Sequence, residues 1–242
     1  MKLYIFKRII YYCKMCIDIC IVLICILLLF IGLYAVYDNY MTIQDSLDSS
    51  ILKFKPGYEQ DEENTQQPKD MVAWLTIDNT TIDYPVMQGI DNLEYLNKNP
   101  FGEYSLAGSI FLDFRNKADF SDEYNLIYGH HMDGGNMFGA LDAYENETYL
   151  EEHNTGILTV GNKVYDINLF ATITVDATDK IIFSISDKEK VLSYIKKQNK
   201  NSKNFDISKN EKLIALSTCK YPDTIDRTVV IGTLSNKEEY YD

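Results

Sequence analysis

The feature that most constrains this chain is an uncharged apolar stretch near its N-terminus, Ile19 to Tyr37. At about 1.5 Å of rise per residue, a helix of this length just spans a hydrocarbon core of about 30 Å. Four basic residues precede the stretch, and Asp38 follows it. Because the basic flank of a spanning helix stays in the cytoplasm, we predict a cytoplasmic segment at 1–18, a transmembrane signal anchor at 19–37 and an extracytoplasmic remainder. A cleaved signal peptide is the alternative, but the apolar run is long for one and no clean cleavage site follows it.

The charge of the predicted outer part limits its partners. Beyond residue 18 the chain has 19 basic and 35 acidic residues, a formal charge of −16. This excess of acid disfavours nucleic acid and anionic lipid surfaces. Residues 38–70 are polar and predict an extracytoplasmic spacer, with a short helix within Gln44–Phe54 that uses Ile51, Leu52 and Phe54 as its apolar contacts. The following stretch to Asp70 has almost nothing to bury.

From residue 71 onward the chain consists of short runs rich in β-branched and aromatic residues, the composition of strands. Gly161-Asn162 between two such runs predicts a two-residue hairpin. Many short strands at this spacing predict a mainly β domain, a barrel or a sandwich, over residues 71–235, with a tail at 236–242. The predicted strands are Val72–Ile77, Thr81–Val86, Ser109–Asp113, Asn125–Tyr128, Ile157–Val160, Lys163–Val175, Leu213–Thr218 and Thr228–Leu234.

One segment of this domain has helical spacing instead. Ser186 with Glu189 three residues later forms a capping box. Val191, Leu192 and Ile195 then make an apolar stripe. We therefore expect one amphipathic helix, ending at about Asn199–Asn204, inserted before the strand that leads to Cys219.

Cys219 is the only cysteine beyond the predicted membrane segment, since the other four lie at positions 13, 16, 20 and 25. It therefore has no partner for an internal disulfide, and is either a small buried hydrophobe or a reactive thiol. Free thiols are mostly protonated at neutral pH, and a nearby cation populates the thiolate. Arg227 opens the next apolar run and would return beside Cys219 if the two strands pair antiparallel. The alternative for Arg227 is a surface ion pair with Asp223 or Asp226.

The chain has three histidines. His130 ends an apolar strand and follows Gly129, a position where catalytic groups are often found; the alternative is a solvated loop histidine. His131 is the weaker candidate, because its side chain should point to the opposite face. His153 lies in a polar stretch and is expected at the surface.

These residues match a family. The run Leu216-Ser217-Thr218-Cys219, with Arg227 eight residues later and Val229-Val230 after it, resembles the active-site signature of sortases, the transpeptidases that attach proteins to the Gram-positive cell wall. Tyr128-Gly129-His130 with the following Met132 and Gly135–Phe138 resembles the histidine segment of class B sortases. The likeness covers about residues 71–235 and includes Trp74–Ile77, Ile82–Val86, Gln88-Gly89, Asp91-Asn92, Tyr95-Leu96 and Gly108–Asp113.

The resemblance implies an eight-stranded β-barrel with an N-terminal helix and the helix inserted before the cysteine strand. It implies that Cys219 attacks the carbonyl after the Thr of a sorting motif, often of the Asn-Pro-x-Thr type. His130 would protonate the leaving amine and Arg227 would steady the oxyanion. Ser217 and Thr218 would line the groove. A cell-wall peptide or lipid-linked precursor amine would then resolve the thioester.

No cofactor is expected, because no group of His, Cys, Asp and Glu has metal-ligand spacing. Two alternative functions stay open. One is a cysteine endopeptidase on the same scaffold, since hydrolysis and transpeptidation share an acyl-enzyme. The other is a non-enzymatic surface-tethered module, which predicts a buried and unreactive Cys219.

Overall fold

The computed structural model describes residues 2–46, 49–57, 67–185, 187–198, 207–208, 211–219 and 224–237. The chain divides into two compact units, Met1–Gln44 and Asp45–Asp242. Helix α1 (Lys2–Ser46) makes up the first unit. It is longer than the predicted span, because the polar flanks of the apolar run are helical too. Within it, Tyr4–Gln44 is long and apolar enough to cross a membrane, a property that a signal sequence shares.

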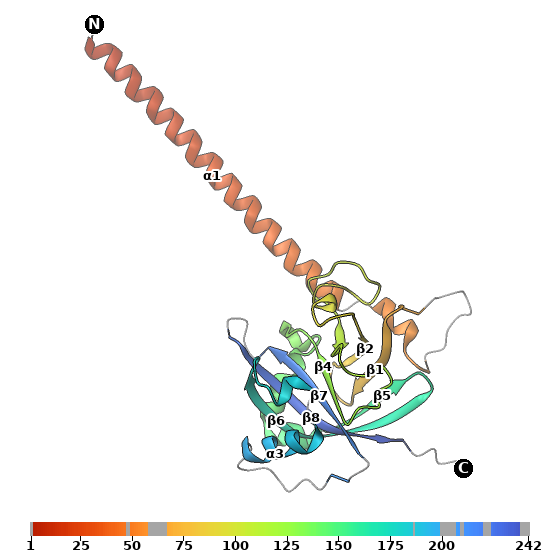
Figure 1. Ribbon diagram of the computed structural model, residues 1–242. Coiled ribbons are helices and arrows are strands. Elements are labelled where there is room, and N and C mark those ends of the chain that lie inside the picture. Colours follow the sequence, from red (N-terminus) through yellow and green to blue (C-terminus); the bar gives the residue numbers. More distant parts are fainter. Residues whose placement is uncertain are drawn as a thin grey trace. The chain divides into compact units, whose positions relative to one another are not determined.

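The described part of the second unit contains a closed eight-stranded barrel in the order β1-β2-β3-β4-β7-β8-β6-β5 (Figure 1). The pairs β2–β3 and β4–β7 are parallel, and the other neighbours are antiparallel. The predicted barrel and its hairpin at Gly161-Asn162 are confirmed, with strand ends shifted by up to two residues. The strands are β1 (Met71–Ile77), β2 (Asp83–Met87), β3 (Ile110–Leu112), β4 (Tyr124–Tyr128), β5 (Thr155–Val160), β6 (Lys163–Asp176), β7 (Lys212–Cys219) and β8 (Asp226–Asn236).

Helix α3 (Lys188–Gln198) is the predicted insertion before the cysteine strand, and its stripe Val191, Leu192 and Ile195 is buried. The Asp187 carboxylate accepts a hydrogen bond from the Glu189 backbone N–H (2.8 Å) and so caps the helix start. The predicted cap Ser186 and stop Asn199–Asn204 lie outside the described residues. Unpredicted are the short α2 (Glu147–Glu152) and the 3-10 helices η2 (Glu94–Leu96), η3 (Asp133–Gly135), η4 (Gly139–Glu145) and η5 (Ile182–Ser184).

The barrel wall separates two apolar clusters. All eight strands contribute side chains to the interior cluster, which includes Ile127, Leu216 and Val230. The outer cluster joins α3 and η5 to the outside of β4, β6, β7 and β8, through residues such as Leu126 and Ala215. Side chains alternate between the two faces of a strand. A residue two positions away from a member of either cluster therefore lies on the same side of the barrel wall as that member.

The 3-10 helix η1 (Ser49–Phe54) is the short helix expected in this region. Ile51 and Phe54 pack against the buried Trp74 of β1. Just beyond it, Lys55 pairs with Asp83 at 2.6 Å, and Asp83 also accepts hydrogen bonds from Trp74 Nε1 and Thr76 Oγ1. Burial acts to raise the pKa of Asp83, but these hydrogen bonds and the Lys55 charge hold it below its usual value.

Candidate active site

Cys219 and Arg227 lie directly opposite each other. Cys219 ends β7, Arg227 is the second residue of β8, and the antiparallel register pairs the two residues. Their Cα atoms are therefore separated by about 5 Å, the spacing of neighbouring strands. The antiparallel pairing of β7 and β8 therefore returns Arg227 beside Cys219.

His130 lies on the other side of Cys219. The parallel strands β4 and β7 pair Tyr128 with Ser217, and the Gly129 N–H continues the ladder by donating to the Ser217 carbonyl at 3.1 Å. Extending this register by one more step brings His130 level with Cys219. Cys219 thus lies between Arg227 of β8 and His130, which follows the end of β4 by two residues, and we refer to these three residues as the row.

Strand alternation sets all three on one face. Leu213 and Ala215 of β7 belong to the outer cluster, as do Val229 of β8 and Leu126 of β4. Counting in steps of two from these residues assigns Cys219, Arg227 and His130 to the outer face of the barrel. All three are half-buried, so they are neither sealed in the core nor fully exposed.

His130 is held by the backbone of the β2–β3 connection. Its Nε2 lies 2.7 Å from the Leu96 carbonyl oxygen. A carbonyl only accepts, so Nε2 carries the hydrogen and Nδ1 is the nitrogen left to exchange a proton. Gly108 makes room for this contact: with φ of +61°, a Cβ there would lie 2.5 Å from the Leu96 oxygen and 3.0 Å from His130 Cδ2.

The guanidinium of Arg227 donates to the Asp226 carbonyl at 3.2 Å. Among the described residues it forms no ion pair with the Asp226 carboxylate, one of the two alternatives considered for it. The other, Asp223, lies outside the described residues, as do Lys220 to Pro222. The local contact leaves the guanidinium other N–H groups that can bind an anion.

Ser217 and Thr218, the expected groove residues, occupy opposite faces of β7. Ser217 shares the face of Cys219, whereas Thr218 points with its partner Thr228 toward the barrel interior. Both side chains are buried, and their hydroxyl oxygens have no hydrogen-bond partner among the described residues. Alternation thus turns the Thr218 side chain away from the thiol and leaves Ser217 on the face of Cys219.

The other two histidines have partners of their own. His131 Nε2 lies 2.6 Å from the Asp142 carboxylate of η4, away from the Leu96 contact of His130. His153 follows α2 and is half-buried rather than simply at the surface. Its ring stacks on Tyr149 at 3.9 Å, and its Nδ1 is 3.0 Å from the Tyr149 carbonyl.

A group that the sequence did not reveal lies beside β4. The Asp113 side chain is fully buried and pairs with Arg115 at 2.6 Å. It also accepts hydrogen bonds from Asn92 Nδ2 (2.9 Å) and the Tyr128 hydroxyl (3.1 Å). Burial acts to raise the pKa of Asp113, but the hydrogen bonds from Arg115 and Asn92, with the Arg115 charge, lower it overall. The only sequence signal is an arginine two residues after an aspartate, which is too common to single out.

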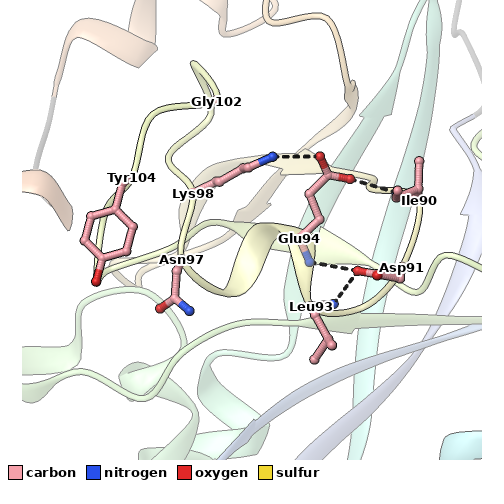
Figure 2. A pocket seen from close by; sticks show the side chains of 8 residues that line it. All are labelled: Ile90, Asp91, Leu93, Glu94, Asn97, Lys98, Gly102 and Tyr104. Carbon is pink, nitrogen blue, oxygen red and sulfur yellow. Dashed lines mark hydrogen bonds and ion pairs between the residues drawn. The ribbon is translucent and has the colours of Figure 1, made fainter.

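A pocket of about 620 Å³ opens on the β2–β3 connection, which also carries Leu96. Figure 2 shows that the acidic side chains of this pocket accept hydrogen bonds from other residues of the same connection. Glu94 accepts from Lys98 Nζ and the Ile90 N–H, both at 2.9 Å, and Asp91 accepts from the N–H groups of Leu93 and Glu94. The described residues contain no group of three or more His, Cys, Asp and Glu able to hold a metal. The lining is Ile90, Asp91, Leu93, Glu94, Asn97, Lys98, Gly102 and Tyr104.

Comparisons with known proteins agree with this arrangement. Residues 75–235 match the family described as Sortase domain. The chain is 37% identical over 175 residues to Sortase B of Listeria monocytogenes, covering 70% of this chain and 71% of that protein. It is 28% identical to Sortase B of Staphylococcus aureus, over 81% of this chain and 83% of that one. A class B sortase of Streptococcus pyogenes involved in pilus biogenesis superposes with a TM-score of 0.63 and 41% identity, covering 69% of this chain and 92% of that one.

Proposed function

This chain belongs to the sortase family, whose class B members are cysteine transpeptidases of the cell wall, and we propose from that premise that Cys219, His130 and Arg227 are its catalytic residues. The single observation that supports the assignment is the row that the register builds, with Cys219 between His130 and Arg227 on the outer face. A nucleophile, a proton donor and an anion stabiliser, brought together at the ends of three adjacent strands, supply what acyl transfer through a thioester requires.

In this reaction His130 starts with a proton on Nδ1, and Cys219 attacks as the thiolate at the carbonyl carbon after the Thr of the sorting motif. The C–S bond forms, and the developing oxyanion is stabilised by the Arg227 guanidinium, which has N–H groups beyond the one on the Asp226 carbonyl. His130 gives a proton to the leaving nitrogen as the C–N bond breaks. Its Nε2 is engaged with the Leu96 carbonyl, so we assign the transfer to Nδ1.

The second half of the reaction returns the enzyme to its starting state. An acceptor amine attacks the thioester, the new C–N bond forms, and the Cys219 sulfur leaves as a thiolate. The proton lost by the amine passes to His130, which is then ready for the next turnover. Ser217 shares the Cys219 face, and we place it, rather than the inward-facing Thr218, in the substrate-binding surface.

The substrates that we propose are secreted proteins with an Asn-Pro-x-Thr-like sorting signal and an amine of a peptidoglycan peptide or its lipid-linked precursor. We propose that α1 anchors the enzyme in the cell membrane, with the N-terminus in the cytoplasm and the catalytic domain outside. The helix is long and apolar enough for this role, and the basic residues before its uncharged stretch favour that orientation.

A peptide assay tests the proposal. The full chain in detergent micelles is incubated with Asn-Pro-x-Thr peptides, with and without a short glycine peptide as the amine, and the products are identified by mass spectrometry. We expect cleavage after Thr and an amide adduct that exceeds the free acid. Cys219→Ala should form neither product. Cleavage by Cys219→Ala would refute the thiol mechanism, and free acid alone at saturating amine would support the endopeptidase instead.

A further inference from the structure

The Asp113–Arg115 pair joins segments that lie far apart in the sequence. Arg115 Nε and one terminal nitrogen bind the two Asp113 oxygens at 2.8 and 2.6 Å, in the bidentate geometry of a guanidinium and a carboxylate. The same terminal nitrogen donates to the Phe183 carbonyl at 2.7 Å. Phe183 belongs to η5, so this one side chain links the β3–β4 connection to the β6–β7 connection.

Two further side chains converge on the same carboxylate. Asn92, on the β2–β3 connection, donates from Nδ2 to Asp113, and its Oδ1 accepts from the Phe114 N–H at 3.0 Å. Tyr128, on β4, donates its hydroxyl, and its ring lies between those of Phe111 and Phe183, with centroids at 5.4 and 6.3 Å. Three connections and one strand therefore meet at a single buried charge.

The connections held together here lie at the two ends of the row of candidate catalytic residues. The β2–β3 connection reaches His130 through the Leu96 carbonyl. The β6–β7 connection leaves β6 next to Arg227, because Val175 and Asp176 pair with Arg227 and Asp226. The Asp113–Arg115 pair links these two connections. It therefore sets how far apart they lie on either side of the outer face that carries the Cys219 thiol.

We propose that the Asp113–Arg115 pair is a positioning unit for peptide binding. It fixes the β2–β3 and β6–β7 connections against β4 and so sets the width of the surface that receives the sorting peptide. The inference rests on the proposed function and adds a specificity-determining pair to it. Neither residue touches the reacting atoms, so their effect is on peptide binding more than on the chemical step.

Stability alone is a poor reason for such a pair. The Asp113 carboxylate is fully buried and loses solvation, whereas the Arg115 side chain is 38% exposed, so water screens its charge and reduces the Coulomb gain. What the pair supplies is geometry, because the planar fork of Arg115 meets the carboxylate and the Phe183 carbonyl at once. A lysine keeps the charge but, as a point donor, cannot reproduce the fork.

The test is Arg115→Lys in the full chain in detergent, compared with Lys117→Gln. Lys117 lies in the same β3–β4 connection and pairs with Asp122 at 3.6 Å, with a side chain that is 70% exposed. We expect Arg115→Lys to raise the KM for the sorting peptide about tenfold while kcat stays within about twofold. Hydrogen exchange at residues 179–185 should become faster. Lys117→Gln should change neither quantity.

A KM within twofold of the wild type, with unchanged exchange at 179–185, would overturn the proposal. If Arg115→Lys does not fold, the uncharged double variant Asp113→Asn with Arg115→Met replaces it, since it leaves no buried unpaired charge. A folded double variant with wild-type KM would overturn the proposal equally. If the proposed function itself is wrong, the wild-type chain will cleave no sorting peptide. Hydrogen exchange in Arg115→Lys would still test whether the Asp113–Arg115 pair holds the β6–β7 connection in place.

Discussion

Replacing Gly108 by alanine tests how His130 is held. A Cβ at this position would lie 2.5 Å from the Leu96 oxygen, 2.8 Å from the Tyr95 oxygen and 3.0 Å from His130 Cδ2. Ordinary contact begins at 3.4 Å, so the Leu96 carbonyl would have to retreat by 3.4 minus 2.5, or about 0.9 Å. That carbonyl accepts the hydrogen bond that orients the imidazole, so the ring should move with it.

Two effects of different size are expected from Gly108→Ala. The left-handed φ of +61° costs an alanine about 1–2 kcal/mol of stability. A displacement of about 1 Å in a catalytic group can reduce the rate about 100-fold. We therefore expect kcat/KM for peptide cleavage to fall about 100-fold, with a larger loss of unfolding free energy than the φ strain alone produces.

Gly161→Ala is the matched control. Gly161 lies in the β5–β6 hairpin with a φ of +59°, and a Cβ there would meet nothing within 4 Å. It should lose about 1 kcal/mol of stability in urea unfolding and keep its activity. If folded Gly108→Ala cleaves peptide within threefold of Gly161→Ala, the account of how His130 is oriented is refuted.

The histidines, the Asp83 cluster and the core give further predictions. His130→Gln should reduce turnover at least 100-fold and His131→Gln less than threefold, because only His130 shares the row with Cys219; equal losses in a peptide assay would contradict this. Asp83→Asn should lose about 1 kcal/mol at pH 7. The folded-state pKa of Asp83 is lowered, so its contribution is fully present above the unfolded pKa of about 3.9 and is lost as pH falls through the folded value. Urea unfolding should therefore show a smaller gap between wild type and variant at pH 3 than at pH 7. Leu216→Ala should cost about 2–5 kcal/mol by leaving a cavity in the barrel interior, and a smaller loss in the same experiment would contradict the close packing assigned to that face.

The strands could be predicted from the sequence because each contains a run of β-branched or aromatic residues long enough to show the composition of a strand. The apolar stripe of α3 was readable for the same reason. Helix α2 and the 3-10 helices η2 to η5 were missed, since three to seven residues hold too little of any period. The sequence marked only the apolar stretch at 19–37 within α1, because apolar composition identifies a membrane-length run and says nothing of helical polar flanks.

The candidate catalytic side chains could be predicted from the sequence, but the groups that hold them in position could not. Cys219, His130 and Arg227 each follow or open an apolar run, a pattern visible in the sequence. The Leu96 carbonyl that holds His130 is backbone, so no residue type marks it. Thr218 was assigned to a groove by resemblance, and only the register reveals that its side chain faces inward.

The proposed mechanism requires that Cys219 becomes acylated in a site that it shares with His130. The most direct measurement is to acid-quench the full chain within seconds of adding an Asn-Pro-x-Thr peptide and map the adduct by tandem mass spectrometry. We expect the peptide's acyl fragment, ending at Thr, on Cys219 alone, and slower formation of this adduct in His130→Gln. Cleavage with no adduct on Cys219, or an adduct that forms equally fast in His130→Gln, would contradict it.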